Sequence, residues 1–127
     1  MERSNSVLAD DFLDCIAVLN AHRVAFVLVG GYAVGWHGVV RATGDIDFLY
    51  RQTTSNVTRL CHALREFGAP EHLIDRTFLM TPNACTQIGL PPLRIDLLAA
   101  ITSVSFAEVK AGAETAQIEG QSLLIIG

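Results

Sequence analysis

The spacing of apolar residues divides the chain into helical and extended segments of ordinary length. After Asp10 and Asp11, apolar positions recur near one helical turn apart as far as Leu19, which predicts an amphipathic helix. Residues 25–29 form a continuous apolar run ahead of two glycines, as expected for a strand buried on both faces. A short helix is predicted to follow at residues 32–37.

The rest of the chain mixes one long helical pattern with several short extended ones. Residues 45–50 begin with alternating acidic and apolar side chains, which predicts a strand with one face toward a site and the other toward the core. A helix is predicted from Thr53 or Thr54 to Phe67, where Gly68 ends it. Further strands are predicted at residues 76–80, 86–89, 93–98, 114–118 and 122–126, with a brief helix at 104–111. This mixture predicts an α/β (α+β) fold.

The composition fits one folded domain that spans residues 1–127. Half of the residues are hydrophobic and 17% are charged, which provides a core and argues against disorder. The formal charge of -4 gives no overall basic field that would attract nucleic acid. Three cysteines without metal-ligand spacing, and an N-terminus without a signal-peptide pattern, predict a cytoplasmic protein. No membrane association is expected, because glycines and His37 interrupt the apolar residues 24–40.

Two acidic residues lie two positions apart at the start of the predicted strand 45–50. Such residues point to the same side of a strand, about 7 Å apart at the backbone, so the Asp45 and Asp47 carboxylates can converge on one cation. Without a cation or hydrogen-bond donors, each carboxylate would raise the pKa of the other. Magnesium prefers carboxylate, water and phosphate oxygens. The alternative is a solvated strand edge, where both acids face water.

The glycine pair and a third acid favour a site over a solvated edge. Gly30 and Gly31 allow a sharp turn after the buried strand, which would bring backbone N–H groups close to a phosphate. Asp96 stands among apolar residues, where a buried carboxylate needs a partner. Arg94 is the alternative partner, but it is expected to point to the opposite face from Asp96.

A strand at residues 93–98 that pairs beside residues 45–50 would bring Asp96 to Asp45 and Asp47. Three carboxylates can hold two magnesium ions about 4 Å apart, one on a triphosphate and one that activates an attacking hydroxyl. This chemistry is in-line nucleotidyl transfer, with Asp96 as the candidate that assists deprotonation of the acceptor.

Three motifs together resemble the minimal nucleotidyltransferase superfamily, over roughly residues 24–98. They are Val29-Gly30-Gly31, then Arg41-Ala42-Thr43-Gly44-Asp45-Ile46-Asp47-Phe48, and later Arg94-Ile95-Asp96-Leu97. The glycine pair followed by Arg-x-Thr-x-Asp-Ile-Asp is most similar to the branch of abortive-infection and toxin–antitoxin nucleotidyltransferases. The resemblance implies a mixed sheet with helices packed against it, magnesium dependence, and transfer of a nucleoside monophosphate from ATP or another triphosphate.

Position by position, the resemblance assigns roles to seven residues. The phosphate turn corresponds to Gly30 and Gly31, the metal-binding acids to Asp45, Asp47 and Asp96, and supporting nucleotide-binding positions to Arg41 and Thr43. The acceptor is left open between tRNA, a protein and a small molecule such as an aminoglycoside antibiotic.

The chain departs from the family at its end, because relatives usually continue into helices that contribute acceptor contacts. A second subunit can supply that wall, or the domain can be an inactive nucleotidyltransferase-fold module that binds a partner or nucleotide. The apolar residues 123–126 suggest a homodimer, with a strand buried in the chain's own sheet as the alternative.

Overall fold

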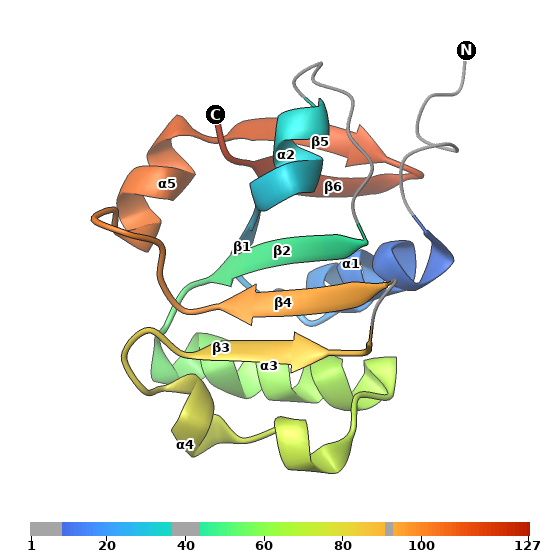
Figure 1. Cartoon of the computed structure of the whole chain (residues 1–127), viewed down its shortest axis with the longest axis vertical. Coiled ribbons are helices and arrows are strands. Elements are labelled where there is room, and N and C mark those ends of the chain that lie inside the picture. The colour runs from blue at the N-terminus through green and yellow to red at the C-terminus, as the bar shows by residue number, and fades with distance from the viewer. Residues whose placement is uncertain (1–8, 37–43, 91–92) are drawn as a thin grey trace.

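A computed structural model describes residues 9–36, 44–90 and 93–127. Within these ranges the chain forms a six-stranded sheet with helices on both faces (Figure 1). The elements are, in chain order, α1 (Asp10–Ala21), β1 (Phe26–Val29), α2 (Gly30–Trp36), β2 (Asp45–Tyr50), α3 (Thr54–Phe67), the 3-10 turn η2 (Glu71–Leu73), α4 (Arg76–Leu79), β3 (Cys85–Ile88), β4 (Arg94–Leu98), α5 (Phe106–Gly112), β5 (Glu114–Ile118) and β6 (Gln121–Ile125). The predicted α+β class is confirmed.

The sheet is mixed, with the strand order β3-β4-β2-β1-β6-β5. β2 pairs antiparallel with β1 and parallel with β4, while β6 pairs parallel with β1 and antiparallel with β5. The last strand along the chain therefore lies inside the sheet. Leu123 and Ile125 are buried there, so the alternative explanation of the apolar C-terminal segment is the one observed. The homodimer loses that support and stays a prediction.

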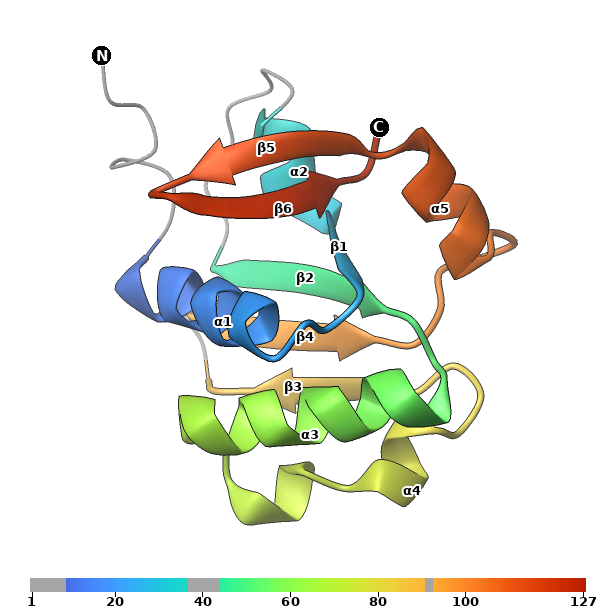
Figure 2. The ribbon, with the colours of Figure 1, turned by 180° about the vertical axis from the view of Figure 1, so that it is seen from behind.

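Helices α1 and α3 cover one face of the sheet (Figure 2). Toward them β2 turns Ile46, Phe48 and Tyr50, and β4 turns Ile95 and Leu97, all of which belong to one buried apolar cluster. Because neighbouring side chains on a strand point to opposite faces, the residues between these core positions must face away from α1 and α3.

Helix α3 agrees with its prediction at both ends. The Thr53 hydroxyl accepts a hydrogen bond from the Asn56 backbone N–H at its start. At its end, Gly68 takes a left-handed conformation with φ of 94° and donates its N–H to the carbonyls of Leu64 and Arg65. These local caps explain why the sequence located this helix well. No helix in the described ranges is both long and apolar enough to cross a membrane.

Two local predictions differ from the structure. Residues 76–80 were expected to form a strand, but Arg76–Leu79 is the short helix α4. The Asp75 side chain caps it by accepting a hydrogen bond from the Phe78 N–H at 3.1 Å. This N-cap outweighs the strand preference of an apolar run. The helix expected at residues 32–37 begins earlier, because the glycine pair forms the first turn of α2 (Gly30–Trp36).

Candidate active site

The three predicted acids lie on one face of the sheet. Asp45 and Asp47 alternate along β2 with side chains that pack toward α1 and α3, and Asp96 does the same on β4. On that same face, Leu49 and Leu98 join a second apolar cluster with Val109 of α5. The acids therefore face the side of α5, away from the main core.

The register of β2 and β4 brings Asp47 and Asp96 side by side. The two strands are parallel neighbours, and Asp47 is the direct partner of Asp96, while Asp45 is the partner of Arg94. β2 and β4 are far apart in the sequence, and their pairing in the sheet brings the two acids together. The Asp96 side chain is 10% exposed and that of Asp45 is 40% exposed, so the cluster runs from a buried inner acid to an outer one in contact with solvent.

Arg94 joins two of the three acids. Its Nε donates to Asp96 Oδ1 at 2.9 Å, and its Nη2 donates to Asp96 Oδ2 at 3.3 Å. The same Nη2 donates to Asp45 Oδ2 at 3.0 Å. One guanidinium thus binds both oxygens of the inner acid and one oxygen of the outer acid.

The expectation that Arg94 points away from Asp96 was wrong. The two residues are separated by one position, Ile95, so on a strand they project to the same face. The same rule of alternation that placed Asp45 beside Asp47 would have found this contact. Arg94 is therefore a residue of the candidate site that the sequence interpretation missed.

Asp47 binds its proton more tightly than an ordinary aspartate. Burial is the main cause, followed by a side-chain hydrogen bond with Asp96 and the negative charges of Asp96 and Asp45, and together they raise the pKa of Asp47 from 3.8 to about 6. The positive charge of Arg94 opposes this shift. A cation beside this carboxyl group would stabilise its ionised form and lower the raised pKa.

The first glycine of the pair touches the acid cluster. Gly30 has φ of 77°, and a Cβ atom at this position would lie 2.1 Å from Asp47 Oδ2. The register explains the closeness, because Val29, just before Gly30, is the direct partner of Asp47. A side chain at this position would have to take a strained backbone conformation and displace the Asp47 carboxylate, so the β1–α2 junction lies directly against the acids.

Three further residues were predicted to bind the nucleotide, and the structure describes one of them. Gly31 is described and lies in the first turn of α2. Arg41 and Thr43, expected to support nucleotide binding, lie outside the described residues.

Gln87 extends the row of polar residues across the sheet. It is the direct partner of Asp96 on the edge strand β3, and it is exposed. Its neighbours Thr86 and Ile88 are buried, so Gln87 shares the face of the acids. The sequence alone could not have included it, because the pairing of β3 with β4 brings it to the site.

The donor chemistry of the cluster suits a divalent metal ion, but the present side-chain arrangement is built around an arginine. Three carboxylates on one face are the ligands that magnesium prefers. Among the described residues, however, no three histidine, cysteine, aspartate or glutamate side chains are placed so that they could hold one metal ion. The Arg94 guanidinium binds both carboxylate oxygens of Asp96 and one of Asp45.

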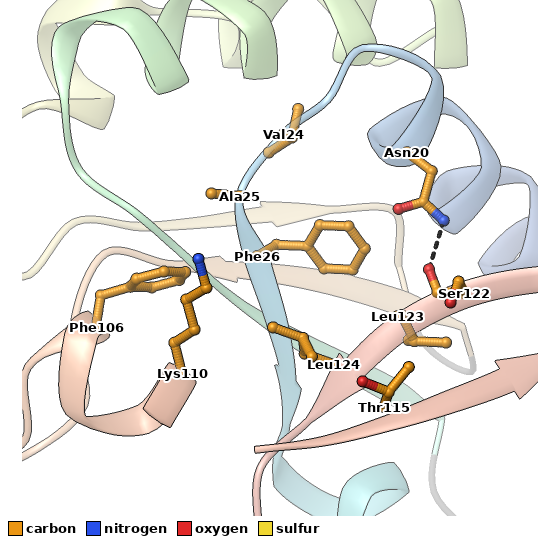
Figure 3. Close-up of a pocket in the computed structure, with 10 residues that line it drawn as sticks. All are labelled: Asn20, Val24, Ala25, Phe26, Phe106, Lys110, Thr115, Ser122, Leu123 and Leu124. Carbon is orange, nitrogen blue, oxygen red and sulfur yellow. Dashed lines mark hydrogen bonds between the residues drawn. The ribbon is translucent and has the colours of Figure 1, made fainter. Parts of the chain in front are cut away.

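A separate cavity of about 340 Å³ lies where β1 begins, whereas Gly30 and the acids lie where β1 ends. Phe26, Phe106, Lys110 and Leu124 are among the residues around it, and the Asn20 amide closes one side by donating to the Ser122 carbonyl at 2.8 Å (Figure 3). Among the described residues that line it, one side chain is cationic and none is acidic. This cavity does not offer the metal chemistry of the acid cluster.

Comparisons with known proteins identify the fold and leave the family open. No protein-family model matches the chain, and no curated protein sequence matches it. Among solved structures, a Thermotoga maritima protein described as a candidate nucleotidyltransferase matches with a TM-score of 0.66 and 10% identity, over 100% of this chain and 80% of that one. The structure of ANT(2")-Ia in complex with adenylyl-2"-tobramycin matches with a TM-score of 0.57 and 16% identity, over 91% of this chain and 67% of that one. The fold is therefore shared with nucleotidyltransferase structures.

Proposed function

We propose that this chain is a metal-dependent nucleotidyltransferase that moves a nucleoside monophosphate from a nucleoside triphosphate to a hydroxyl acceptor. The observation that carries the proposal is the register that sets Asp47 beside Asp96, with Asp45 on the same face and Gly30 against Asp47. The likeness of the whole fold to two nucleotidyltransferase structures supports it. Neither of these structures is described as a toxin or abortive-infection protein, so that finer assignment stays a prediction.

The proposed roles follow from the position of each residue. Asp45, Asp47 and Asp96 would hold one or two Mg²⁺ ions. When bound, the metal would neutralise the triphosphate and lower the pKa of the attacking hydroxyl. Gly30 and Gly31 would let the triphosphate approach the backbone. The protein then acts by orienting the reactants and compensating charge, with no covalent intermediate.

ATP is the proposed donor, and the acceptor is a tRNA, a protein or a small hydroxylated molecule. The ANT(2")-Ia structure contains an adenylylated tobramycin, which supports adenylyl transfer and a small acceptor in this chain too. The formal charge of -4 weighs against a nucleic-acid acceptor, because binding nucleic acid depends on positive charge.

One observation favours a second function, a non-catalytic module on the same fold. Arg94 already compensates Asp45 and Asp96 by hydrogen bonds, so the cluster can persist without a metal. A module of this kind would bind a nucleotide or a partner protein without transferring anything.

The binding test compares thermal unfolding with and without magnesium plus a non-hydrolysable ATP analogue. A ligand well above its dissociation constant stabilises the folded protein by about 2–4 kcal/mol, which raises the wild-type melting temperature by several degrees. The Asp45→Asn/Asp47→Asn double variant is expected to gain little. Asp11→Asn/Asp14→Asn is the control, since it removes the same charge from exposed positions of α1. Equal gains in all three proteins would exclude Asp45 and Asp47 from nucleotide binding.

The catalytic test follows the transfer of label from each of the four nucleoside triphosphates onto a cell extract and onto aminoglycosides. Transfer that disappears in the double variant supports the enzyme. No transfer from any donor, together with magnesium-dependent nucleotide binding, supports the module.

A further inference from the structure

Arg94 places its positive charge directly against two of the three acids of the site. Its guanidinium contacts both oxygens of Asp96 and one oxygen of Asp45, at 2.9–3.3 Å. The contacts to Asp96 form the two-pronged pair that an arginine makes with a carboxylate. The Arg94 side chain is 27% exposed and that of Asp96 is 10% exposed, so the pair is largely shielded from water.

This arrangement compensates part of the negative charge of the acid cluster with a side chain of the protein itself. Three carboxylates on one face repel one another, and Asp96 is too buried to rely on water for compensation. Arg94 supplies one positive charge at hydrogen-bond distance from the inner and the outer acid. Asp47 is the direct partner of Asp96, and burial, followed by a side-chain hydrogen bond with Asp96 and the nearby negative charges, raises its pKa.

The same contacts conflict with metal binding by these acids. An oxygen that accepts a hydrogen bond from a guanidinium directs its lone pair at that donor, and a positive charge repels an incoming cation. We propose that Arg94 is a built-in counter-ion that competes with the divalent metal for Asp45 and Asp96, so that the metal binds only when the arginine releases them. This inference concerns the regulation of the proposed active site and rests on the proposed function.

If Arg94 competes with the metal, its removal should strengthen metal binding. If Arg94 instead supported the metal site, its removal should weaken metal binding. If Arg94 must release the acids first, the observed dissociation constant of the metal is the intrinsic one divided by the fraction of released protein. Removing the arginine therefore tightens metal binding. If the contacts of Arg94 with the acids contribute as much free energy as one charge-assisted hydrogen bond, their loss changes the dissociation constant of the metal about tenfold or more.

The experiment measures the binding of Mn²⁺, as a probe for the metal site, by electron paramagnetic resonance of the free ion at constant pH. Arg94→Gln is expected to bind Mn²⁺ about tenfold more tightly than the wild type, or better. Arg94→Lys keeps the charge but loses the two-pronged geometry, so its affinity is expected between the two. Arg65→Gln is the matched control, because it removes one positive charge from an exposed position on α3, and its affinity should equal that of the wild type.

Circular dichroism establishes that each variant is folded, and Arg94→Lys carries the test if Arg94→Gln does not fold. Mn²⁺ binding to the wild type together with unchanged or weaker binding to Arg94→Gln would overturn the competition and leave the proposed function in place. Equal affinities of Arg94→Lys and the wild type, beside tighter binding to Arg94→Gln, would support competition through the positive charge; the same equality would overturn the competition if Arg94→Gln binds no more tightly. Absence of Mn²⁺ binding in every variant would overturn the proposed function itself.

Discussion

At the scale of single residues, Asp47 links the chemistry of the site to the stability of the fold. Its pKa is raised from 3.8 to about 6, so the folded protein holds a proton that the unfolded chain has already lost between these pH values. The contribution of Asp47 to stability must then fall as the pH rises from about 4 to about 6, because the folded state binds the extra proton. The loss is complete only well above pH 6, where Asp47 is ionised in both states.

Asp47→Asn removes this pH dependence. Without divalent ions, the variant is expected to be more stable than the wild type at pH 7 by about 1 kcal/mol, after allowance for the solvent that screens a half-buried group. Urea denaturation at several pH values measures it, and the difference between the two proteins should grow from pH 4 to pH 6. Asp14→Asn, on the exposed side of α1, is the control for the loss of one negative charge. A difference that does not change with pH would contradict the prediction.

Gly30 owes its identity to two constraints that substitution can separate. In Gly30→Ala the alanine must take a positive φ of 77°, and its Cβ would also clash with Asp47 Oδ2. In Gly68→Ala the alanine must take a φ of 94°, but no atom lies within 4 Å of the new Cβ. The backbone conformation costs each variant about 1–2 kcal/mol. Gly30→Ala should in addition displace the Asp47 carboxylate.

The measurement is the thermal shift with magnesium and the ATP analogue. Gly68→Ala is expected to keep the shift of the wild type, because α3 lies on the other face of the sheet. Gly30→Ala is expected to lose most of it. Retention of the full shift in Gly30→Ala would show that the contact between Gly30 and Asp47 is unimportant for the ligand.

At the scale of secondary-structure elements, Asn56 connects α3 to two strands of the site. This fully buried side chain accepts a hydrogen bond from the Ala25 N–H at 2.7 Å and donates to the Ala25 and Arg51 carbonyls at 3.1 and 2.8 Å. Ala25 directly precedes β1, and Arg51 directly follows β2. The amide therefore fastens the start of one site strand to the end of the other.

Asn56→Ala is expected to lower the free energy of unfolding by about 2–4 kcal/mol, because it leaves buried backbone groups without partners. Guanidinium denaturation measures the change. Asn20→Ala is the matched control, since the Asn20 amide also joins a helix to a strand but donates to the Ser122 carbonyl in an exposed setting, and it should cost less than about 1 kcal/mol. Equal costs for the two variants would contradict the role assigned to Asn56.

At the scale of the whole molecule, the order of strands assembles the site. The β1–α2 junction, β2 and β4 come from distant parts of the chain, and they meet because β2 lies between β1 and β4. A ligand that contacts all of them is linked to the folding of the entire sheet. This is the reason that the binding of magnesium and nucleotide should appear as a shift of global unfolding.

The sequence by itself determined the local features of this protein. Alternation along residues 45–50 shows that Asp45 and Asp47 share a face, and helical spacing with a capping threonine and a glycine locates α3. These features depend on the period of the backbone and on nearby hydrogen bonds, so a short segment contains all the information needed. Applied consistently, the same rule would have placed Arg94 on the face of Asp96.

Only the tertiary structure decided which residues meet across strands. The register of Asp47 with Asp96 and the closeness of Gly30 to Asp47 Oδ2 depend on the pairing of β2 with β4 and with β1. So does the contact of Arg94 with Asp45. Strand neighbours and register are set by the burial of apolar surface over the whole sheet, a sum over distant residues that no local pattern contains.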